Sequence, residues 1–269
     1  MNFFEILSFD FAKRALVAGT LICLCAAILG VNLVLKRFSM LGDGLSHVSF
    51  GSAAIALALG VSPLQISIPV VIVAAFLLLR IKTNGRIKGD AATAIISSSA
   101  LAIGVIVATL TSGMNTDINN YMFGSILALN DTEVYISVGV AVVIIALYTV
   151  FYQKIFACTF DEGFALSSGV NVKLYNSLNA IFVAVIVVVG MRIMGALLIS
   201  SIITFPALSA MRVCNKYKSC VVLSGIISVL AFLVGISLSF LFDMPTGSSV
   251  VVVNLIIFIV MSIVRKIRN

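Results

Sequence analysis

The chain has 269 residues, of which 61% are hydrophobic and 10% are charged, with a formal net charge of +7. An average globular chain carries roughly 25% charged residues, and a soluble fold of this length has too little interior for so much apolar surface. The same numbers exclude a disordered chain, which needs low hydrophobicity and dense charge. Because the charges stand in short clusters between long apolar runs, the composition is typical of an integral membrane protein.

Residues 1–11 precede the first long apolar run. Phe and Ile alternate there with Glu5 and Asp10, which predicts a short interfacial helix. The run that follows is too long for the apolar core of a signal peptide and lacks an obvious small-residue cleavage site. We therefore expect no cleavable signal.

Nine apolar runs are long enough for membrane-spanning helices, which need roughly 20 mostly apolar residues. They cover residues 15–35, 39–59, 64–79, 91–111, 134–152, 176–191, 195–211, 219–242 and 248–264. The second, third and sixth runs are the least secure, so eight spans is the alternative count. The sequence predicts an all-α, polytopic integral membrane protein of 8–9 transmembrane helices, in which residues 1–269 form a single transmembrane domain.

The basic residues predict the orientation of the chain, because Lys and Arg concentrate in cytoplasmic loops. With the N-terminus outside and the C-terminus in the cytoplasm, 14 of the 17 Lys and Arg residues lie on the inner side. Six of the ten acidic residues then lie outside. We expect a multi-pass protein of the lipid bilayer, whose positive charge reflects its topology, and no nucleic-acid partner.

Two ionisable residues stand inside the second predicted span. Asp43 and His47 are four residues apart, so on a helix they lie one turn apart on the same face. Counted from Lys36 at about 1.5 Å per residue, His47 lies roughly 16 Å deep, near the middle of the bilayer. Ionisable side chains at that depth are costly, so they indicate a functional site.

A carboxylate and an imidazole on one face offer oxygen and nitrogen ligands to a divalent transition metal such as Zn²⁺ or Mn²⁺. Two ligands under-fill a metal site, whereas a two-fold homodimer would bring four together. The glycines and serines around the pair permit a close approach of helices. The alternatives are a structural Asp–His hydrogen bond between packed helices and a proton relay.

The longest predicted cytoplasmic loop contains a second motif, residues 160–169, which is typical of a short amphipathic helix. Acidic residues in its first turn suit the helix dipole, a glycine at its end suits a C-terminal cap, and its two phenylalanines and its alanine are expected to share a face. Such a helix docks into a groove of a partner protein or, alternatively, is a re-entrant helix or a helix on the membrane surface. Its candidate contact residues are Phe160, Asp161, Glu162, Phe164, Ala165 and Gly169.

Three further features stand out in the second half of the chain. Arg192, at the outer end of the sixth predicted span, either reaches the outer surface or lines the mouth of a pore. Pro206 removes a helix hydrogen bond and is expected to bend the seventh span. The five cysteines show no disulfide framework and are expected to be reduced, apolar fillers.

The sequence contains no phosphate-binding loop of the form Gly-x-x-x-x-Gly-Lys-Ser/Thr. It also offers no soluble stretch large enough for an ATPase domain. If transport through this chain is driven by ATP, the ATPase is another chain.

Five stretches resemble, in order, the membrane permease subunits of bacterial ATP-binding-cassette importers for zinc, manganese or iron ions. They are residues 36–47, 121–127, 160–162, 195–207 and 243–247. Together with the spans between them, they extend the resemblance over essentially the whole chain. Residues 191–199 are more similar to the zinc members, while Thr204 and Phe205 depart from the small or aliphatic residues that are commoner before the proline.

The resemblance implies that Asp43 and His47 are metal ligands of the translocation path, and that residues 160–169 form the coupling helix against the ATPase. It implies a homodimer in a bacterial plasma (inner) membrane, with two cytoplasmic ATP-binding-cassette ATPase subunits and an extracytoplasmic metal-binding protein. The permease is then no enzyme, since ATP is hydrolysed on the partner chains. It holds no permanent cofactor, only the transported Zn or Mn ion, with zinc preferred.

A rival interpretation is a self-contained secondary carrier, coupled to protons through Asp43 and His47. Such a carrier needs no ATPase. A membrane enzyme is the weakest interpretation, because a single histidine and few paired carboxylates are available for chemistry.

Overall fold

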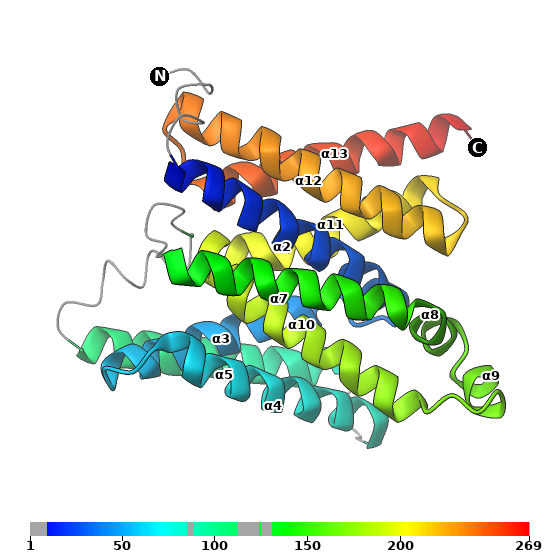
Figure 1. The fold of residues 1–269 in the computed structure, drawn as a ribbon, viewed down its shortest axis with the longest axis horizontal. Coiled ribbons are helices and arrows are strands. Elements are labelled where there is room, and N and C mark those ends of the chain that lie inside the picture. The colour runs from blue at the N-terminus through cyan, green and yellow to red at the C-terminus, as the bar shows by residue number, and fades with distance from the viewer. Residues whose placement is uncertain (1–9, 85–88, 112–123, 125–130, 269) are drawn as a thin grey trace.

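The computed structural model describes residues 10–84, 89–111, 124 and 131–268 (Figure 1). Within these residues every regular element is a helix, which confirms the all-α class. The helices are α2 (Asp10–Leu35), α3 (Leu41–Ala58), α4 (Pro63–Asn84), α5 (Gly89–Leu110), α7 (Asp131–Val150), α8 (Tyr152–Phe160), α9 (Glu162–Ser167), α10 (Val172–Met194), α11 (Ala196–Val213), α12 (Tyr217–Phe242) and α13 (Thr246–Arg268).

Nine of these helices fall on the nine predicted spans, and eight of the nine are long and apolar enough to cross a membrane. The exception is α3, which is less apolar because it carries Asp43, His47 and several glycines and serines. Its 18 residues extend about 27 Å at 1.5 Å per residue, close to the thickness of the hydrocarbon core. The expected count of 8–9 spans is therefore confirmed, and α3 is the difference between the two numbers.

Helices α2 and α10 form the centre of the bundle. In their most apolar stretches 67% and 72% of the residues are buried, compared with 22% in α13. Helix α2 packs against α7, α10, α11 and α12, and in Figure 1 it runs between α12 and α7. The outer helices expose apolar side chains instead, as helices that face lipid do.

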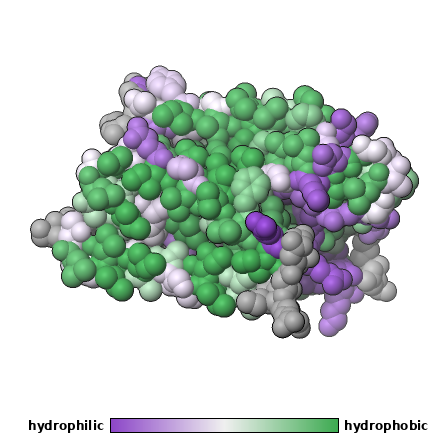
Figure 2. Space-filling model, turned by 90° about the horizontal axis from the view of Figure 1, so that it is seen from below, coloured by the Kyte–Doolittle hydropathy of each residue, from purple (hydrophilic) through white to green (hydrophobic). Residues whose placement is uncertain are grey.

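The segments that the charge bias assigns to the cytoplasm gather at one end of the bundle. Helices α8 and α9 and the C-terminus lie together at the right of Figure 1, whereas α2 begins at the left. Figure 2 shows a mostly hydrophobic face whose hydrophilic residues lie mainly toward the same right-hand end. This separation is what the sequence predicts for a chain whose two termini lie on opposite sides of a membrane.

Glycines bring the backbones of neighbouring helices into contact at two crossings. A Cβ placed on Gly30 of α2 would lie 1.9 Å from the carbonyl oxygen of Ile203 in α11. A Cβ on Gly51 of α3 would lie 2.5 Å from the carbonyl oxygen of Ala100 in α5. Because neither backbone can yield as a flexible side chain would, these crossings require glycine.

A buried polar cluster joins α2, α7 and α12 near α8. The Tyr217 hydroxyl donates to the amide oxygen of Asn32 and lies 2.7 Å from the Tyr148 hydroxyl, while the Asn32 amide nitrogen donates to Tyr148 over 3.4 Å. The Tyr217 ring also packs against Tyr152 and Phe156 of α8, with ring centroids 5.6 and 4.9 Å away. The cluster therefore ties α8 to three spanning helices.

Three smaller predictions have different outcomes. The predicted interfacial helix at 1–11 falls almost wholly outside the described residues, and the last two of its residues belong to α2. Pro206 lies inside α11, which continues through it, so the predicted bend stays a prediction. The five cysteines are free thiols, as expected.

Candidate functional site

Asp43 and His47 lie one turn apart on α3, as their spacing predicts. The Nε2 atom of His47 is 3.8 Å from Oδ1 of Asp43, a distance longer than a hydrogen bond. The two side chains are 24% (His47) and 44% (Asp43) exposed, although most of α3 is buried. The two side chains therefore form no hydrogen bond with each other on α3, and the alternative of a structural Asp–His hydrogen bond between packed helices stays a prediction.

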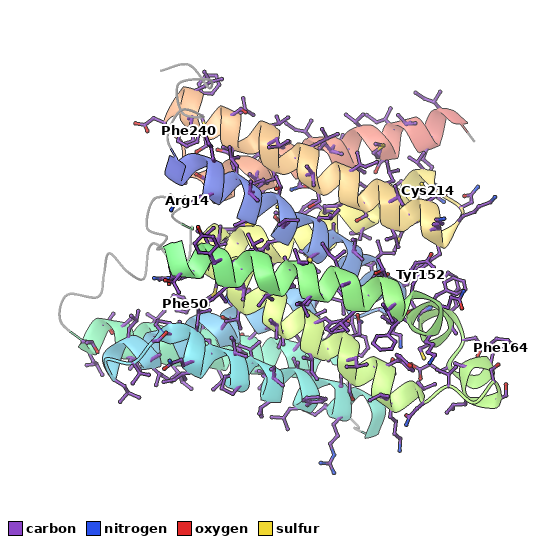
Figure 3. All side chains as sticks on the ribbon, in the orientation of Figure 1. Arg14, Phe50, Tyr152, Phe164, Cys214 and Phe240 are labelled. Carbon is purple, nitrogen blue, oxygen red and sulfur yellow. The ribbon has the colours of Figure 1, made fainter. Side chains whose placement is uncertain are left out.

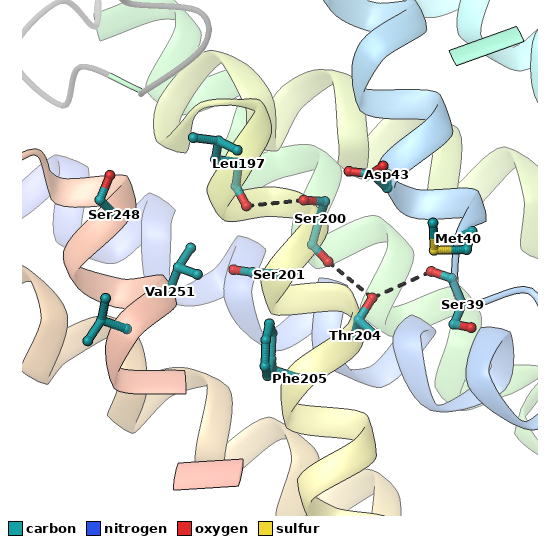
Figure 4. Close-up of a pocket in the computed structure, with 11 residues that line it drawn as sticks. Ser39, Met40, Asp43, Leu197, Ser200, Ser201, Thr204, Phe205, Ser248 and Val251 are labelled. Atoms are coloured by element: carbon teal, nitrogen blue, oxygen red, sulfur yellow. Dashed lines mark hydrogen bonds between the residues drawn. The ribbon is translucent and has the colours of Figure 1, made fainter. Parts of the chain in front are cut away.

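A cavity of about 480 Å³ opens beside Asp43 between α3, α11 and α13 (Figure 4). In the close-up, the Asp43 side chain points from α3 toward α11, where Ser200 lies opposite. The polar lining of the cavity consists of Asp43 and the side chains of Ser39, Ser200, Ser201, Thr204 and Ser248.

The hydroxyl groups of this lining donate to backbone carbonyls. Ser200 donates to Leu197 over 3.1 Å, and Thr204 donates to Ser200 over 3.2 Å. Thr204 also lies 3.5 Å from the carbonyl oxygen of Ser39, which connects α11 to the turn before α3 (Figure 4). Ser201 donates to Leu198 in the same way over 2.9 Å. Because the hydroxyl hydrogens of Ser200, Ser201 and Thr204 are used in these bonds, their oxygens remain as acceptors that can face a cation.

Ser39, Ser200 and Thr204 were not among the site residues predicted from the sequence. The signal for two of them was present, since Ser200 and Thr204 stand four residues apart in an apolar span and so share a helix face. Their proximity to Asp43 depends on the packing of α11 against α3, which the spacing within one helix does not reveal.

The number of charged ligands within one chain is small. Among the described residues, no three His, Cys, Asp or Glu side chains come together in a group that could hold a metal ion. The small residues around Asp43 serve packing inside the chain: a Cβ on Gly42 would lie 2.9 Å from Ile203 of α11, and one on Gly44 would lie 2.4 Å from Thr93 of α5. The expectation that these glycines allow an approach between subunits is therefore wrong for Gly42 and Gly44.

The motif at 160–169 contains the expected short helix as α9, but Phe160 belongs to the preceding helix α8. Helix α8 ends at Phe160, and Asp161 is the N-cap of the six-residue helix α9, where its carboxylate accepts a hydrogen bond from the Phe164 N–H over 3.0 Å. Gly169 has a φ of 78°, and its N–H donates to Leu166 over 3.0 Å, which confirms the predicted glycine cap.

The prediction that Phe160, Phe164 and Ala165 share one helix face is wrong. Phe160 lies on α8, is 59% exposed and packs beside Tyr217, while Phe164 on α9 is 65% exposed. Ala165 is fully buried against the bundle. The exposed large apolar side chains of α8 and α9 are therefore Phe156, Phe160, Phe164 and Leu166.

The structure shows neither of the two roles expected for Arg192, because its side chain forms an ion pair with Glu133. Its Nε atom donates to Oε1 of Glu133 over 2.9 Å, and the two side chains are only 25% and 18% exposed. The ion pair joins the last turn of α10 to the first turn of α7 at the end of the bundle where α2 begins. Its residues are 59 positions apart in the chain, which no local pattern predicts.

Two further motifs of the sequence lie at the same end. Of residues 121–127 only Gly124 is described; it has a φ of 78°, and a Cβ there would lie 2.3 Å from the backbone of Met194. Asp243 ends α12 in a left-handed conformation with a φ of 53°. Both residues shape turns, and neither faces the cavity beside Asp43.

Comparison with known proteins places these observations in context. The sequence model described as "ABC 3 transport family" matches residues 8–265. The manganese import system permease protein ScaB of Streptococcus gordonii is 29% identical to the chain over 94% of its length and 90% of the relative's. The high-affinity zinc uptake system membrane protein ZnuB of Haemophilus influenzae is 31% identical over 93% of the chain and 96% of the relative.

Two solved structures have a fold similar to that of this chain. A chain of PsaBC from Streptococcus pneumoniae, in complex with Fab, superposes with a TM-score of 0.87 and 29% identity, over 98% of this chain and 99% of the other. A putative metal-chelate type ABC transporter in an inward-facing conformation superposes with a TM-score of 0.75 over 93% of this chain and 85% of the other. At 16% identity, this second likeness concerns the fold alone.

Proposed function

The chain belongs to the ABC 3 transport family, and we propose that it is the membrane permease subunit of an importer that takes up a divalent transition-metal ion. The observation that carries the proposal is the pair of ligands on α3: Asp43 lines the cavity, and His47 lies one turn further along the same helix, both partly exposed on a helix that is otherwise mostly buried. Ionisable groups at membrane depth are retained where they line a path or bind a substrate. The whole chain, residues 1–269, then serves as one transmembrane domain.

Two copies of the chain complete the metal site in this proposal. One chain supplies an imidazole and a carboxylate, whereas transition metals in proteins take four ligands or more. A two-fold axis next to α3 would bring both pairs together and double the ligand set. The partial exposure of Asp43 and His47 supports this arrangement, because it leaves room for a second copy to reach them.

Both Zn²⁺ and Mn²⁺ accept a mixed set of imidazole and carboxylate ligands. The named relatives include manganese and zinc permeases. Zinc is the preferred ion in our hypothesis only because residues 191–199 resemble the zinc members. Manganese is the alternative, and uptake from an equimolar panel of ions separates the two.

The energy comes from ATP hydrolysed on two separate ATP-binding-cassette subunits, which contact α9 and the end of α8. The exposed Phe160, Phe164 and Leu166 support this assignment, since aromatic and aliphatic side chains at a cytoplasmic surface suit a groove on a partner protein. An extracytoplasmic metal-binding protein delivers the ion at the opposite end, in a bacterial plasma membrane with the C-terminus of the permease inside. The ion pauses between the Asp43–His47 pairs until closure of the ATPases changes access.

The test is metal uptake into vesicles that contain the permease and its partner ATPase, fed by ATP. Asp43→Asn and His47→Gln should each lower uptake at least about 10-fold, because the loss of a ligand costs no less than the loss of its supporting hydrogen bond. Asp90→Asn is the matched control: Asp90 is an exposed carboxylate in the first turn of α5, and Asn can still stabilise that turn. Wild-type uptake by both the Asp43 and the His47 variants would refute the site.

The secondary carrier remains the second candidate, since Asp43 and His47 also suit a proton relay. The permease alone in vesicles, with a pH gradient and no ATPase, separates the two mechanisms. We expect no uptake under these conditions. Uptake driven by the gradient alone would overturn the ATP-driven mechanism.

A further inference from the structure

The cytoplasmic ends of α2, α9 and α10 meet in a polar joint of three residues: Lys36, Glu162 and Asn176. The Nζ atom of Lys36 lies 3.0 Å from Oε1 of Glu162, and the amide nitrogen of Asn176 donates to the same oxygen over 3.1 Å. Lys36 also donates to the amide oxygen of Asn176. Each residue of the joint therefore contacts the other two, although they are up to 140 positions apart in the chain.

Lys36 is the buried partner of the joint. Its side chain is only 12% exposed, whereas that of Glu162 is 56% exposed. Lys36 lines a small cavity together with apolar residues such as Leu33, Leu41 and Leu79. An ammonium group taken this far out of water is costly unless it is paired, so the attachment of α9 to this position is stronger than an exposed surface ion pair.

The turn that follows Lys36 leads directly to the metal-ligand helix and is hydrogen-bonded along its length. Arg37 has a φ of 59°, and the Phe38 N–H donates back to Leu33 over 2.8 Å, which closes the end of α2. The Leu41 N–H donates to Phe38 over 2.9 Å and begins α3. Because this turn has few free torsions, a displacement of Lys36 displaces the start of α3, and Asp43 lies in its first turn.

On the other side, the joint leads to the surface that faces the cytoplasm. Glu162 is the first residue of α9, directly after the N-cap Asp161. The exposed side chains of Phe164 and Leu166 lie one turn or less further along the same short helix. A partner that pushes or pulls α9 through these side chains therefore moves Glu162 with it.

We propose that Lys36 and Glu162 are positioning residues that transmit the movement of α9 to α3, and so couple ATP hydrolysis on the partner to the state of the Asp43–His47 pair. This inference rests on the proposed function, since it requires an ATPase at α9 and a metal at α3. It predicts a specific defect: without the joint, α9 still receives the ATPase, but its movement no longer reaches the metal ligands.

The experiment measures the metal ions moved for each ATP hydrolysed, in vesicles that hold the permease and its ATPase. Lys36→Met and Glu162→Gln should lower this ratio at least about threefold while ATP hydrolysis continues, because such connecting residues modulate coupling rather than binding. The charge exchange Lys36→Glu with Glu162→Lys should recover part of the ratio, which a purely local defect would not do. Lys266→Met is the matched control, since Lys266 is exposed near the end of α13.

A ratio equal to that of the wild type in both single variants overturns the inference. Glu162→Gln decides the matter if Lys36→Met does not assemble, because Glu162 is half exposed and its amide keeps the shape of the side chain. A wild-type permease that moves no metal with ATP refutes the proposed function itself, and the inference with it. Normal wild-type uptake together with unchanged variants refutes the inference alone.

Discussion

The contact between Gly30 and Ile203 makes a sharp prediction about stability. The change Gly30→Ala adds one methyl group, whose carbon would lie 1.9 Å from the backbone oxygen of Ile203, whereas ordinary contacts begin at 3.4 Å. Helices α2 and α11 must therefore separate locally by about 1.5 Å. No rotamer change relieves the clash, because both partners are backbone atoms of packed helices.

The expected cost follows from overpacking, which typically destabilises a core by 1–3 kcal/mol. Since the backbone itself must move, we expect the upper end of that range, about 3 kcal/mol. In a domain of this size that corresponds to a fall in Tm of roughly 6–12 °C. Ile203 lies between Ser200 and Thr204 on α11, so the same displacement shifts the wall of the cavity beside Asp43 and lowers metal uptake.

Gly139→Ala is the matched control, because it makes the same chemical change in the helix α7. A Cβ on Gly139 meets nothing within 4 Å, so the change adds only helix propensity, worth up to about 1 kcal/mol of stabilisation. Thermal unfolding of both purified variants, monitored in the same detergent, gives the comparison. A Gly30→Ala variant that unfolds at or above the wild-type temperature would refute the reasoning.

The remaining predictions concern the end of the bundle where α8 and α9 lie. Tyr217→Phe leaves the buried amide oxygen of Asn32 without its hydroxyl donor, so it should lower the free energy of unfolding by about 1–3 kcal/mol, measured by thermal unfolding. Tyr135→Phe, at a 69% exposed position, is the control and should not change stability measurably. Burial raises the pKa of the Cys158 thiol, and the nearby Lys36 opposes that rise, so less of the reactive thiolate forms once Lys36 is replaced. In a variant whose only cysteine is Cys158, Lys36→Met should slow alkylation at a fixed pH of about 8; faster alkylation would contradict the electrostatic contact.

The positions of the spanning helices were predictable because long apolar runs have few alternatives in a membrane. The pair on α3 was predictable for a related reason: an Asp and a His four residues apart share a helix face whatever surrounds them. The break between α8 and α9 was not, since Phe160 suits either helix and the cap at Asp161 decides where the chain turns. Spacing patterns within one helix do not predict where that helix ends and the next one begins.

The other differences between the sequence predictions and the structure arise from contacts between helices. Gly42 and Gly44 resemble a surface for a second subunit in the sequence, but in the fold they pack against α11 and α5 of their own chain. Small residues permit a close approach without specifying which helix approaches. The same holds for Arg192, whose partner Glu133 comes from a helix three elements earlier and is chosen by the packing of α7 against α10.

The packing of α3 bears on how a metal site in this chain would work. Gly51 brings α3 against the backbone of α5, and Gly42 brings it against Ile203 of α11, so α3 packs closely against both helices. Asp43 and His47 are carried together on it, with no hydrogen bond between them. In the proposed dimer, a rotation or translation of α3 would therefore change the distance of both ligands from a second copy at once, without breaking any contact within the pair. The proposed joint at Lys36 lies just before this helix, where a movement of α9 would reach it.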